Sequence, residues 1–299
     1  MEEIFLSAVD DYQLTVHVFA VNDAKAVVQI VHGMEEHQER YEPLVKFLNQ
    51  HGYSVVTSDM RGHGHHATDL GYFKDKNGYR YLIKDQQTIT QYISEKFQGL
   101  PIYLLAHSMG TIITRVLLQT DSTKYQKVVL SGYPNYQSGA RFGIMIANLT
   151  KAFHGAKYKS KFIQNLSVGA FNKKIKNPQT DCDWVCANPT ALQAYRDDPL
   201  CGFGFTCSAF DDLFHLVVLM HQPKRYVDVN TALPFLMLRG CDDPCTGGVK
   251  GATDSQKTLR RAGFQHLTVI DYPAMRHEIL NETDRQKVYD DILAFYQKA

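Results

Sequence analysis

The sequence contains no apolar run of about 18 residues, the length that a membrane-spanning helix needs. It also has no excess of one charge, because 32 lysines and arginines face 31 aspartates and glutamates and leave a net charge of +1. This balance gives no reason to expect a nucleic-acid partner. With 44% hydrophobic residues among 299, disordered and collagen-like chains are excluded as well. The length fits one large α/β domain with an insertion, or two domains.

Cysteines are few for this length, at six. The first residues are acidic where a secretory signal would be basic, so we expect reduced thiols in a cytoplasmic protein. Cys182 and Cys186, like Cys241 and Cys245, are four residues apart, a spacing that zinc sites permit. No neighbouring histidine completes either pair, so we expect no metal.

Strand-like and helix-like segments alternate along both ends of the chain. Such alternation with short connections predicts an α/β protein with a mostly parallel, doubly wound sheet. The expected strands are Gln13–Ala20, Ala26–His32, Tyr53–Ser58, Ile102–Ala106, Lys127–Ser131, Leu233–Arg239 and Leu267–Asp271. The expected helices are Glu39–His51, Tyr81–Phe97, Met109–Gln119, Thr253–Ala262 and Thr283–Lys298.

The alternation stops after Gly132 and resumes near Ala232, which predicts an insertion over one edge of the sheet. The insertion contains two helix-like pieces and a turn-rich middle. From Ser122 to Thr180 there is no aspartate or glutamate, but there are ten lysines and arginines. Because the whole chain has a net charge of +1, the residues outside this stretch have a net charge of −9. A solvated basic face and a surface attracted to anionic lipid head groups both explain this stretch.

An apolar stripe lies within the insertion at helical spacing. A stripe of this kind packs into a core more often than it contacts lipid, so we expect it to be buried. Its members are Phe142, Met145, Ile146, Leu149 and Phe153.

The segment Ile102–Thr111 runs from a strand through a serine flanked by small residues directly into a helix. It matches the Gly-x-Ser-x-Gly nucleophile elbow, except that Ala106 replaces the first glycine. The sharp turn strains the backbone and places the Ser108 hydroxyl at the carboxyl edge of the sheet. The pattern therefore predicts Ser108 as a nucleophile.

A serine hydroxyl needs a base, and the base needs an orienting acid. In this arrangement the order along the chain is serine, acid, histidine, each just after a strand. His277 follows the last expected strand, and Asp242 and Asp243 follow the strand before it. We favour Asp243 because Pro244 holds it away from helical geometry, with Asp242 as the alternative.

The oxyanion of an acyl intermediate needs two backbone N–H donors. One is expected from Met109, directly after the nucleophile. The other is expected from Met34, in the loop after the strand Ala26–His32.

Three motifs, His32–Tyr41, Asp59–Gly64 and the Ser108 elbow, together resemble the monoacylglycerol lipase and lysophospholipase group of α/β-hydrolases. The resemblance implies an α/β-hydrolase core over residues 1–132 and 232–299 and a cap over 133–231 that forms an acyl-binding pocket. It also implies the Ser108, Asp243 and His277 triad with Met34 and Met109 as oxyanion donors.

Ala106 is one departure from the pattern of this group, and His66, where the group usually has serine, is a second. His63, His65 and His66 suggest a metal site, but the resemblance places His63 in a structural loop. Within the same loop, Asp59 and Arg61 are expected to pair with each other.

We therefore expect a serine ester hydrolase that cleaves single-chain, monoacylglycerol-like esters through an acyl-serine intermediate and without a cofactor. The alternatives are a lysophospholipase, a serine aminopeptidase-type amide hydrolase and, least favoured, a non-catalytic binding protein with this fold. The expected partners are a small acyl ester and an anionic membrane touched by the basic cap. Chain length of the acyl group, head group and oligomeric state do not follow from the sequence.

Overall fold

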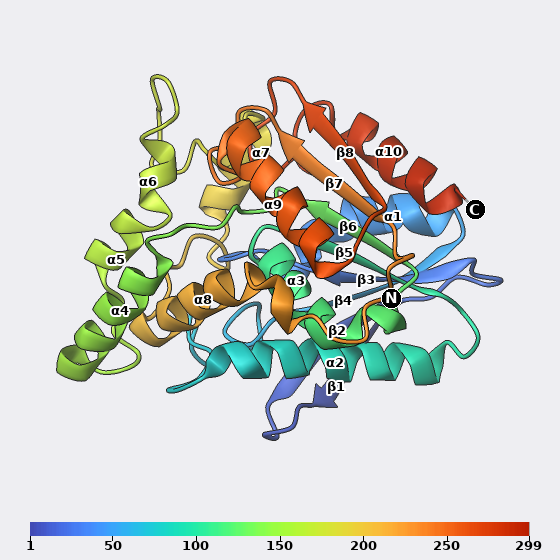
Figure 1. Ribbon diagram of the computed structural model, residues 1–299, viewed down its shortest axis with the longest axis horizontal. Helices are drawn as coiled ribbons and strands as arrows, with labels where there is room; N and C mark the ends of the chain where they lie inside the picture. Colours follow the sequence, from blue (N-terminus) through green and yellow to red (C-terminus); the bar gives the residue numbers. More distant parts are fainter. Residues whose placement is uncertain (299) are drawn as a thin grey trace.

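The computed structural model describes residues 1–298, which contain an eight-stranded sheet in the order β1-β2-β4-β3-β5-β6-β7-β8 (Figure 1). The β1–β2 and β2–β4 pairs are antiparallel, and all other pairs are parallel. The expected mostly parallel sheet is confirmed. Its strands are β1 (Glu2–Ser7), β2 (Gln13–Phe19), β3 (Ala26–Val31), β4 (Tyr53–Ser58), β5 (Ile102–His107), β6 (Lys127–Ser131), β7 (Phe235–Gly240) and β8 (Leu267–Tyr272).

The central strands form where the sequence is rich in apolar and β-branched residues. Every residue of β3, β4, β5 and β7 is buried, because helices cover both faces of the sheet. The edge strand β1 was not expected from the sequence. It alternates between exposed and half-buried residues and is held by antiparallel pairing with β2, a partner that a local pattern does not reveal.

Helices pack on both faces of the sheet, so the doubly wound arrangement is confirmed (Figure 1). One face is covered by α1 and α10, and the other by α2, α3, α8 and α9. The bounds in the core are η1 (Gln38–Tyr41), α1 (Glu42–Gln50), α2 (Gly78–Lys96), α3 (Met109–Asp121), η2 (Ser122–Lys124), α9 (Gly248–Ala262) and α10 (Arg285–Gln297).

The chain between β6 and β7 is entirely helical or irregular. Its helices α4, α5 and α6 lie beyond one end of the sheet in Figure 1, whereas α8 packs against α2 and α3. Five α-helices occur here instead of the two expected, since the additional ones have only four to nine residues. They are α4 (Ala140–His154), α5 (Lys161–Leu166), α6 (Gly169–Asn172), α7 (Pro189–Asp197) and α8 (Cys207–Met220), followed by η3 (Pro223–Arg225). No helix within residues 1–298 has the length and hydropathy to cross a bilayer.

The expected Asp59–Arg61 pair is wrong. Arg61 is buried and donates to both carboxylate oxygens of Asp85, at 2.7 and 2.8 Å, and to Asp10 at 3.1 and 3.2 Å. Asp59 instead accepts from the backbone and side chain of Gln38, at 2.9 and 3.0 Å. Each side chain finds a partner from a distant part of the chain, and sequence proximity does not predict this.

We expect Arg61→Met to lower the free energy of unfolding by about 3–5 kcal/mol, because it leaves the buried Asp85 carboxylate without its counter-charge. Urea denaturation measures the change. As a control, Lys46→Met removes an exposed pair with Glu42 and should leave the denaturation midpoint unchanged. A midpoint for Arg61→Met equal to that of the wild type would contradict the expectation.

Candidate active site

Ser108 occupies the turn between β5 and α3, with φ 49° and ψ −121°. A positive φ is unusual for a residue with a side chain, so the turn is strained, as expected for a nucleophile elbow. The backbone N–H of Ser108 donates to the Ser131 carbonyl at 3.0 Å, which ties the turn to the end of β6.

Gly110 allows α3 to approach β3 closely. A Cβ atom at this position would lie 2.2 Å from the Val31 carbonyl oxygen and 2.5 Å from that of His32. No side chain fits in this space, which explains the glycine of the motif. Ala106, at the other small position, is fully buried in β5.

The structure brings Ser108, His277 and Asp243 together. His277 Nε2 lies 2.7 Å from Ser108 Oγ, and His277 Nδ1 lies 2.9 Å from Asp243 Oδ2. The other oxygen of Asp243 accepts from the Cys245 backbone N–H at 2.7 Å. One chain of hydrogen bonds therefore joins loops that follow β5, β7 and β8.

Of the two neighbouring aspartates, only Asp243 faces His277. Its residue exposure is 2%, whereas Asp242 is exposed and its backbone N–H donates to the Met275 carbonyl at 3.0 Å. Adjacent residues of a turn point in different directions, so only one of them reaches the imidazole.

Burial on its own lowers the pKa of His277, but the carboxylates of Asp243, Glu278 and Glu36 outweigh it and the net shift is upward. The His107 ring lies 4.9 Å from the His277 ring, and burial lowers the pKa of His107 to about 3, so His107 is neutral. The Trp184 ring, from the insertion, also lies 4.9 Å from His277. Sequence patterns gave no signal for Trp184.

The two expected oxyanion donors belong to the same cavity as Ser108. Met34 and Met109 both line the cavity that Ser108 and His277 line. Neither of their backbone N–H groups is used in the hydrogen bonds found among residues 1–298. Gly33 keeps this loop close to the serine, since a Cβ there would lie 3.0 Å from Ser108 Cβ.

The cavity at Ser108 has a volume of about 430 Å³. Part of its polar lining, Glu35, Glu36, Tyr195 and Glu278, comes from the loops near the triad and from α7. The segment between β6 and β7 also contributes Asn135, Gln137, Ser167 and Lys174. Its apolar lining comes mainly from α3 and the insertion: Ile112, Phe142, Leu166, Val168, Phe171, Leu213, Phe214 and Val217. A mostly apolar cavity with a few polar groups is typical of a small-molecule site.

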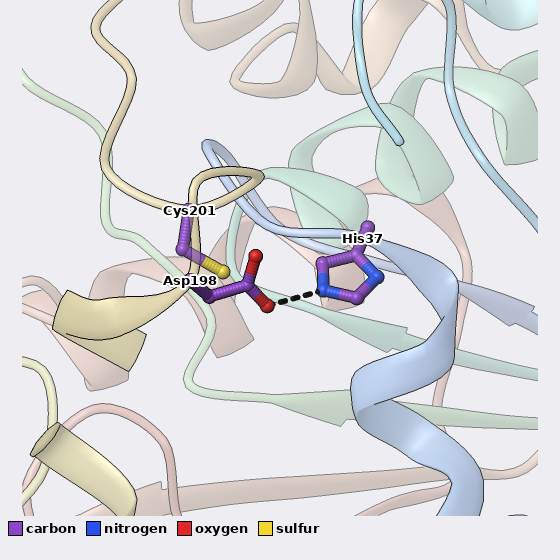
Figure 2. A group of neighbouring side chains, drawn as sticks. All are labelled: His37, Asp198 and Cys201. Carbon is purple, nitrogen blue, oxygen red and sulfur yellow. Dashed lines mark hydrogen bonds and ion pairs between the residues drawn. The ribbon is translucent and has the colours of Figure 1, made fainter. Parts of the chain in front are cut away.

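Two groups of three metal-ligating side chains occur within the described residues, and neither is one of the expected cysteine pairs. One contains Cys245 together with Asp243 and His277, which bond to each other. The other contains His37, Asp198 and Cys201 (Figure 2). Neither group includes His63, which is buried and accepts from the Glu35 backbone N–H at 3.3 Å.

The His37 group is explained by hydrogen bonds. Figure 2 shows the His37 ring pointing at Asp198, with Nε2 2.8 Å from Oδ2. The other oxygen of Asp198 accepts from the Leu200 backbone N–H at 2.8 Å. The contact joins the loop after β3 to the segment between α7 and α8.

The sequence and the fold have counterparts in known proteins. A family model described as serine aminopeptidase, S33 matches residues 22–284. The chain belongs to this family. The resemblance to the monoacylglycerol lipase and lysophospholipase group of α/β-hydrolases is thereby confirmed.

Two relatives and one solved structure cover nearly the whole chain. The monoacylglycerol lipase of Mycolicibacterium smegmatis is 23% identical over 276 residues, 91% of this chain and 88% of its own length. The monoglyceride lipase of Homo sapiens is 24% identical over 270 residues, 86% of this chain and 80% of its own. The carboxyl esterase of Bacillus coagulans superposes with a TM-score of 0.91 at 22% identity, covering 99% of this chain and 97% of its own. The expected α/β-hydrolase fold is confirmed.

Proposed function

We propose that this protein is a serine ester hydrolase that cleaves single-chain acyl esters of the monoacylglycerol kind. The observation that carries the proposal is the hydrogen-bonded chain Asp243–His277–Ser108 at the wall of a largely apolar cavity. The names of the two relatives, a monoacylglycerol lipase and a monoglyceride lipase, support the same substrate class.

In the proposed reaction, Ser108 Oγ attacks the acyl carbonyl while His277 Nε2 takes its proton. The buried Asp243 carboxylate holds the imidazole in the required tautomer and stabilises its charged form. The backbone N–H groups of Met34 and Met109 donate to the oxyanion.

His277 then gives the proton to the leaving alcohol, and the acyl group stays on Ser108 as an ester. A water molecule attacks this ester by the same sequence, with His277 as base and then as acid. The free acid leaves and the serine hydroxyl is restored. These steps use only groups of this chain and water.

We further propose that residues 133–231 form a cap over a core made of residues 1–132 and 232–299. Helices α4, α6 and α8 of this segment contribute most of the apolar lining of the cavity, which suits an acyl chain. The polar lining, with Glu35 and Tyr195, then faces the alcohol part of the ester.

Glu35 favours a neutral alcohol over the lysophospholipid alternative. Its residue exposure is 6%, it accepts from Gln164 Nε2 at 3.1 Å, and the charge of Lys159 lowers its pKa by less than burial raises it. Burial raises its pKa, and a phosphate bound beside it would raise that pKa further. In its charged form Glu35 therefore disfavours a second negative charge beside it, whereas Lys174 on the same cavity wall is the group that would attract one.

Two further alternatives have less support. An amide hydrolase of the aminopeptidase type needs acidic groups in the cap to hold a free amine. Asp183 is instead bonded to Gln179 and Thr180, and Asp198 to His37. A non-catalytic role would be indicated by the loss of a triad residue, and all three are present.

A contact with anionic membranes is also part of the proposal. The apolar stripe on α4, expected to be buried, has Phe142, Met145, Leu149 and Phe153 exposed, and only Ile146 half-buried. Phe142 lines the cavity and is also 57% exposed, so the exposed stripe continues to the cavity mouth. Exposed apolar side chains at such a mouth favour a lipid surface.

The basic charge of this region is smaller than its composition suggests. Acidic residues outside the stretch neutralise part of it, through the pairs Lys151–Asp211 at 3.1 Å and Lys157–Asp69 at 2.8 Å. Lys161 is exposed next to the exposed Phe162, and Lys173, Lys174 and Lys176 are exposed as well. Apolar contact, supported by these lysines, is therefore the main attraction that we propose.

We also propose a cytoplasmic location. All six cysteines are free in the structure, and four of them are buried. Free thiols persist in reducing compartments.

The first prediction tests the hydrolase itself. A fluorophosphonate probe should label the wild type but not Ser108→Ala, because the probe reacts with an activated serine. Asp243→Asn should lower kcat for a monoacylglycerol by about 10⁴-fold, since the histidine then adopts the wrong tautomer. Asp242→Asn is the matched control and should keep the wild-type kcat. A folded wild type that takes no label would refute the proposed function.

The second prediction concerns the substrate. We expect the wild type to hydrolyse monoacylglycerol faster than a lysophospholipid with the same acyl chain. Glu35→Gln should raise the ratio of lysophospholipid to monoacylglycerol kcat/KM by about tenfold, which corresponds to about 1.4 kcal/mol. Tyr195→Phe is a useful control because it alters the same lining without changing charge. An unchanged ratio in Glu35→Gln would contradict the role given to this carboxylate.

The third prediction concerns the membrane. Phe162 on α5 is 64% exposed and is part of the same apolar surface that we propose. Phe153→Ser together with Phe162→Ser should reduce co-sedimentation with vesicles of phosphatidylcholine and phosphatidylglycerol, at both low and high salt. The matched control is Val249→Ser, which removes an apolar side chain that is 72% exposed on α9. Vesicle binding that survives in the double variant, or is lost equally in the control, would argue against this surface.

A further inference from the structure

Three ionisable side chains are buried next to the triad. Arg40 is 12% exposed, Glu36 4% and Glu278 6%. The Arg40 guanidinium donates to Glu36 Oε2 at 2.8 Å and to the two oxygens of Glu278 at 2.6 and 2.7 Å. We call these three residues the Arg40 cluster.

Glu36 connects the cluster to the loop of the expected oxyanion donor. Its Oε1 accepts from the Gly33 backbone N–H at 2.5 Å and from the Tyr41 hydroxyl at 2.9 Å. Gly33 directly precedes Met34. A Cβ on Gly33 would lie 2.6 Å from Glu36 Oε1, so carboxylate and backbone are in close contact. The orientation of the Met34 N–H therefore depends on where Glu36 is held.

Glu278 connects the cluster to the histidine, which it directly follows in the chain. Its Oε2 also accepts from Asn281 Nδ2 at 3.0 Å, and its backbone N–H donates to the Val185 carbonyl of the insertion at 2.8 Å. Burial on its own raises the pKa of Glu278, but Arg40 outweighs it and lowers that pKa to about 2. Glu278 is therefore charged at neutral pH.

Stability alone gives a weak reason for such a cluster. Well-packed apolar side chains in place of a buried ion group often leave stability unchanged or improve it. A planar guanidinium that bonds to two carboxylates at once, however, fixes the distance and angle between the loops that carry them. Here these loops carry Met34 and His277.

We propose that Arg40 is a positioning residue that holds the oxyanion loop and the histidine loop at their working separation through Glu36 and Glu278. This inference rests on the proposed ester hydrolysis. Arg40 touches no reacting atom, and it acts through the groups that do.

A second consequence concerns the basicity of His277. As stated above, Glu278 and Glu36 contribute with Asp243 to the upward shift of its pKa. His277 must be neutral to act as a base, so activity falls as the pH drops through its pKa. The titratable and charged groups near His277 are Asp243 and Cys245 from the loop after β7, His107 from β5, Glu36 from the oxyanion loop, and Glu278, with Arg40 bonded to both glutamates.

The experiment compares kcat, KM and pH profiles on a small ester, p-nitrophenyl butyrate, with active sites counted by fluorophosphonate titration. Arg40→Met should lower kcat per active site by about 10- to 100-fold, with KM within about threefold of wild type. Arg40→Lys should recover part of the loss, because an ammonium keeps the charge but cannot bond to both carboxylates in the same planar way.

Glu278→Gln keeps the shape of the side chain and removes its charge. The acidic limb of its kcat/KM profile should move to lower pH, because His277 loses a neighbouring negative charge. A merely structural role would lower the amplitude of the profile without moving its limb. If Arg40→Met does not fold, the Glu278→Gln and Arg40→Lys variants test the inference instead.

Arg61→Met is the matched control, because Arg61 also bonds two carboxylates but lies in a different ion group. It should keep the wild-type kcat per active site and the wild-type pH profile. Three results would overturn the inference without contradicting the proposed ester hydrolysis. They are a wild-type kcat in Arg40→Met, a change in Arg40→Met that affects KM but not kcat, and an acidic limb of the pH profile that does not move in Glu278→Gln. A folded wild-type protein that takes no fluorophosphonate label would overturn both the proposed ester hydrolysis and the role of Arg40.

Discussion

The close approach of α3 to β3 at Gly110 is the constraint on which the candidate site depends. It leaves no room for a Cβ, and it lets β5 turn directly into α3 with Ser108 at a positive φ. The hydroxyl then lies at the carboxyl edge of the sheet, the same edge at which the loops after β3, β7 and β8 end. A parallel sheet brings these loops together whatever their separation in the chain. Ser108 and His277 are 169 positions apart in the sequence, yet Ser108 Oγ and His277 Nε2 lie 2.7 Å apart.

The two halves of the cavity have different origins. The core supplies the hydrogen-bonding groups, which are held by strand ends and by buried ion groups. The segment between β6 and β7 supplies most of the apolar lining through its helices, and four large side chains of α4 on this segment are exposed. This division suits a reaction whose chemistry needs fixed geometry and whose acyl chain needs only an apolar volume.

Sequence reasoning was accurate where a local pattern is sufficient. The continuous apolar runs of β3 and β5 and the elbow at Ser108 can be recognised without knowledge of the fold, because burial on both faces and a strained turn each demand particular residues. It was wrong or silent where a partner comes from far away. Arg61 pairs with Asp85 and Asp10 and not with Asp59, and β1 forms only through pairing with β2.

The sequence by itself determined the family, the order of serine, acid and histidine, and the alternation of strands and helices, because each depends on residues close together or on simple order along the chain. Only the tertiary structure decided that Asp243 and not Asp242 faces His277, that Trp184 and Glu35 line the site, and that Arg40 bonds to both Glu36 and Glu278. These outcomes depend on side-chain directions and on contacts across as many as 238 positions of the chain, and local sequence patterns contain neither.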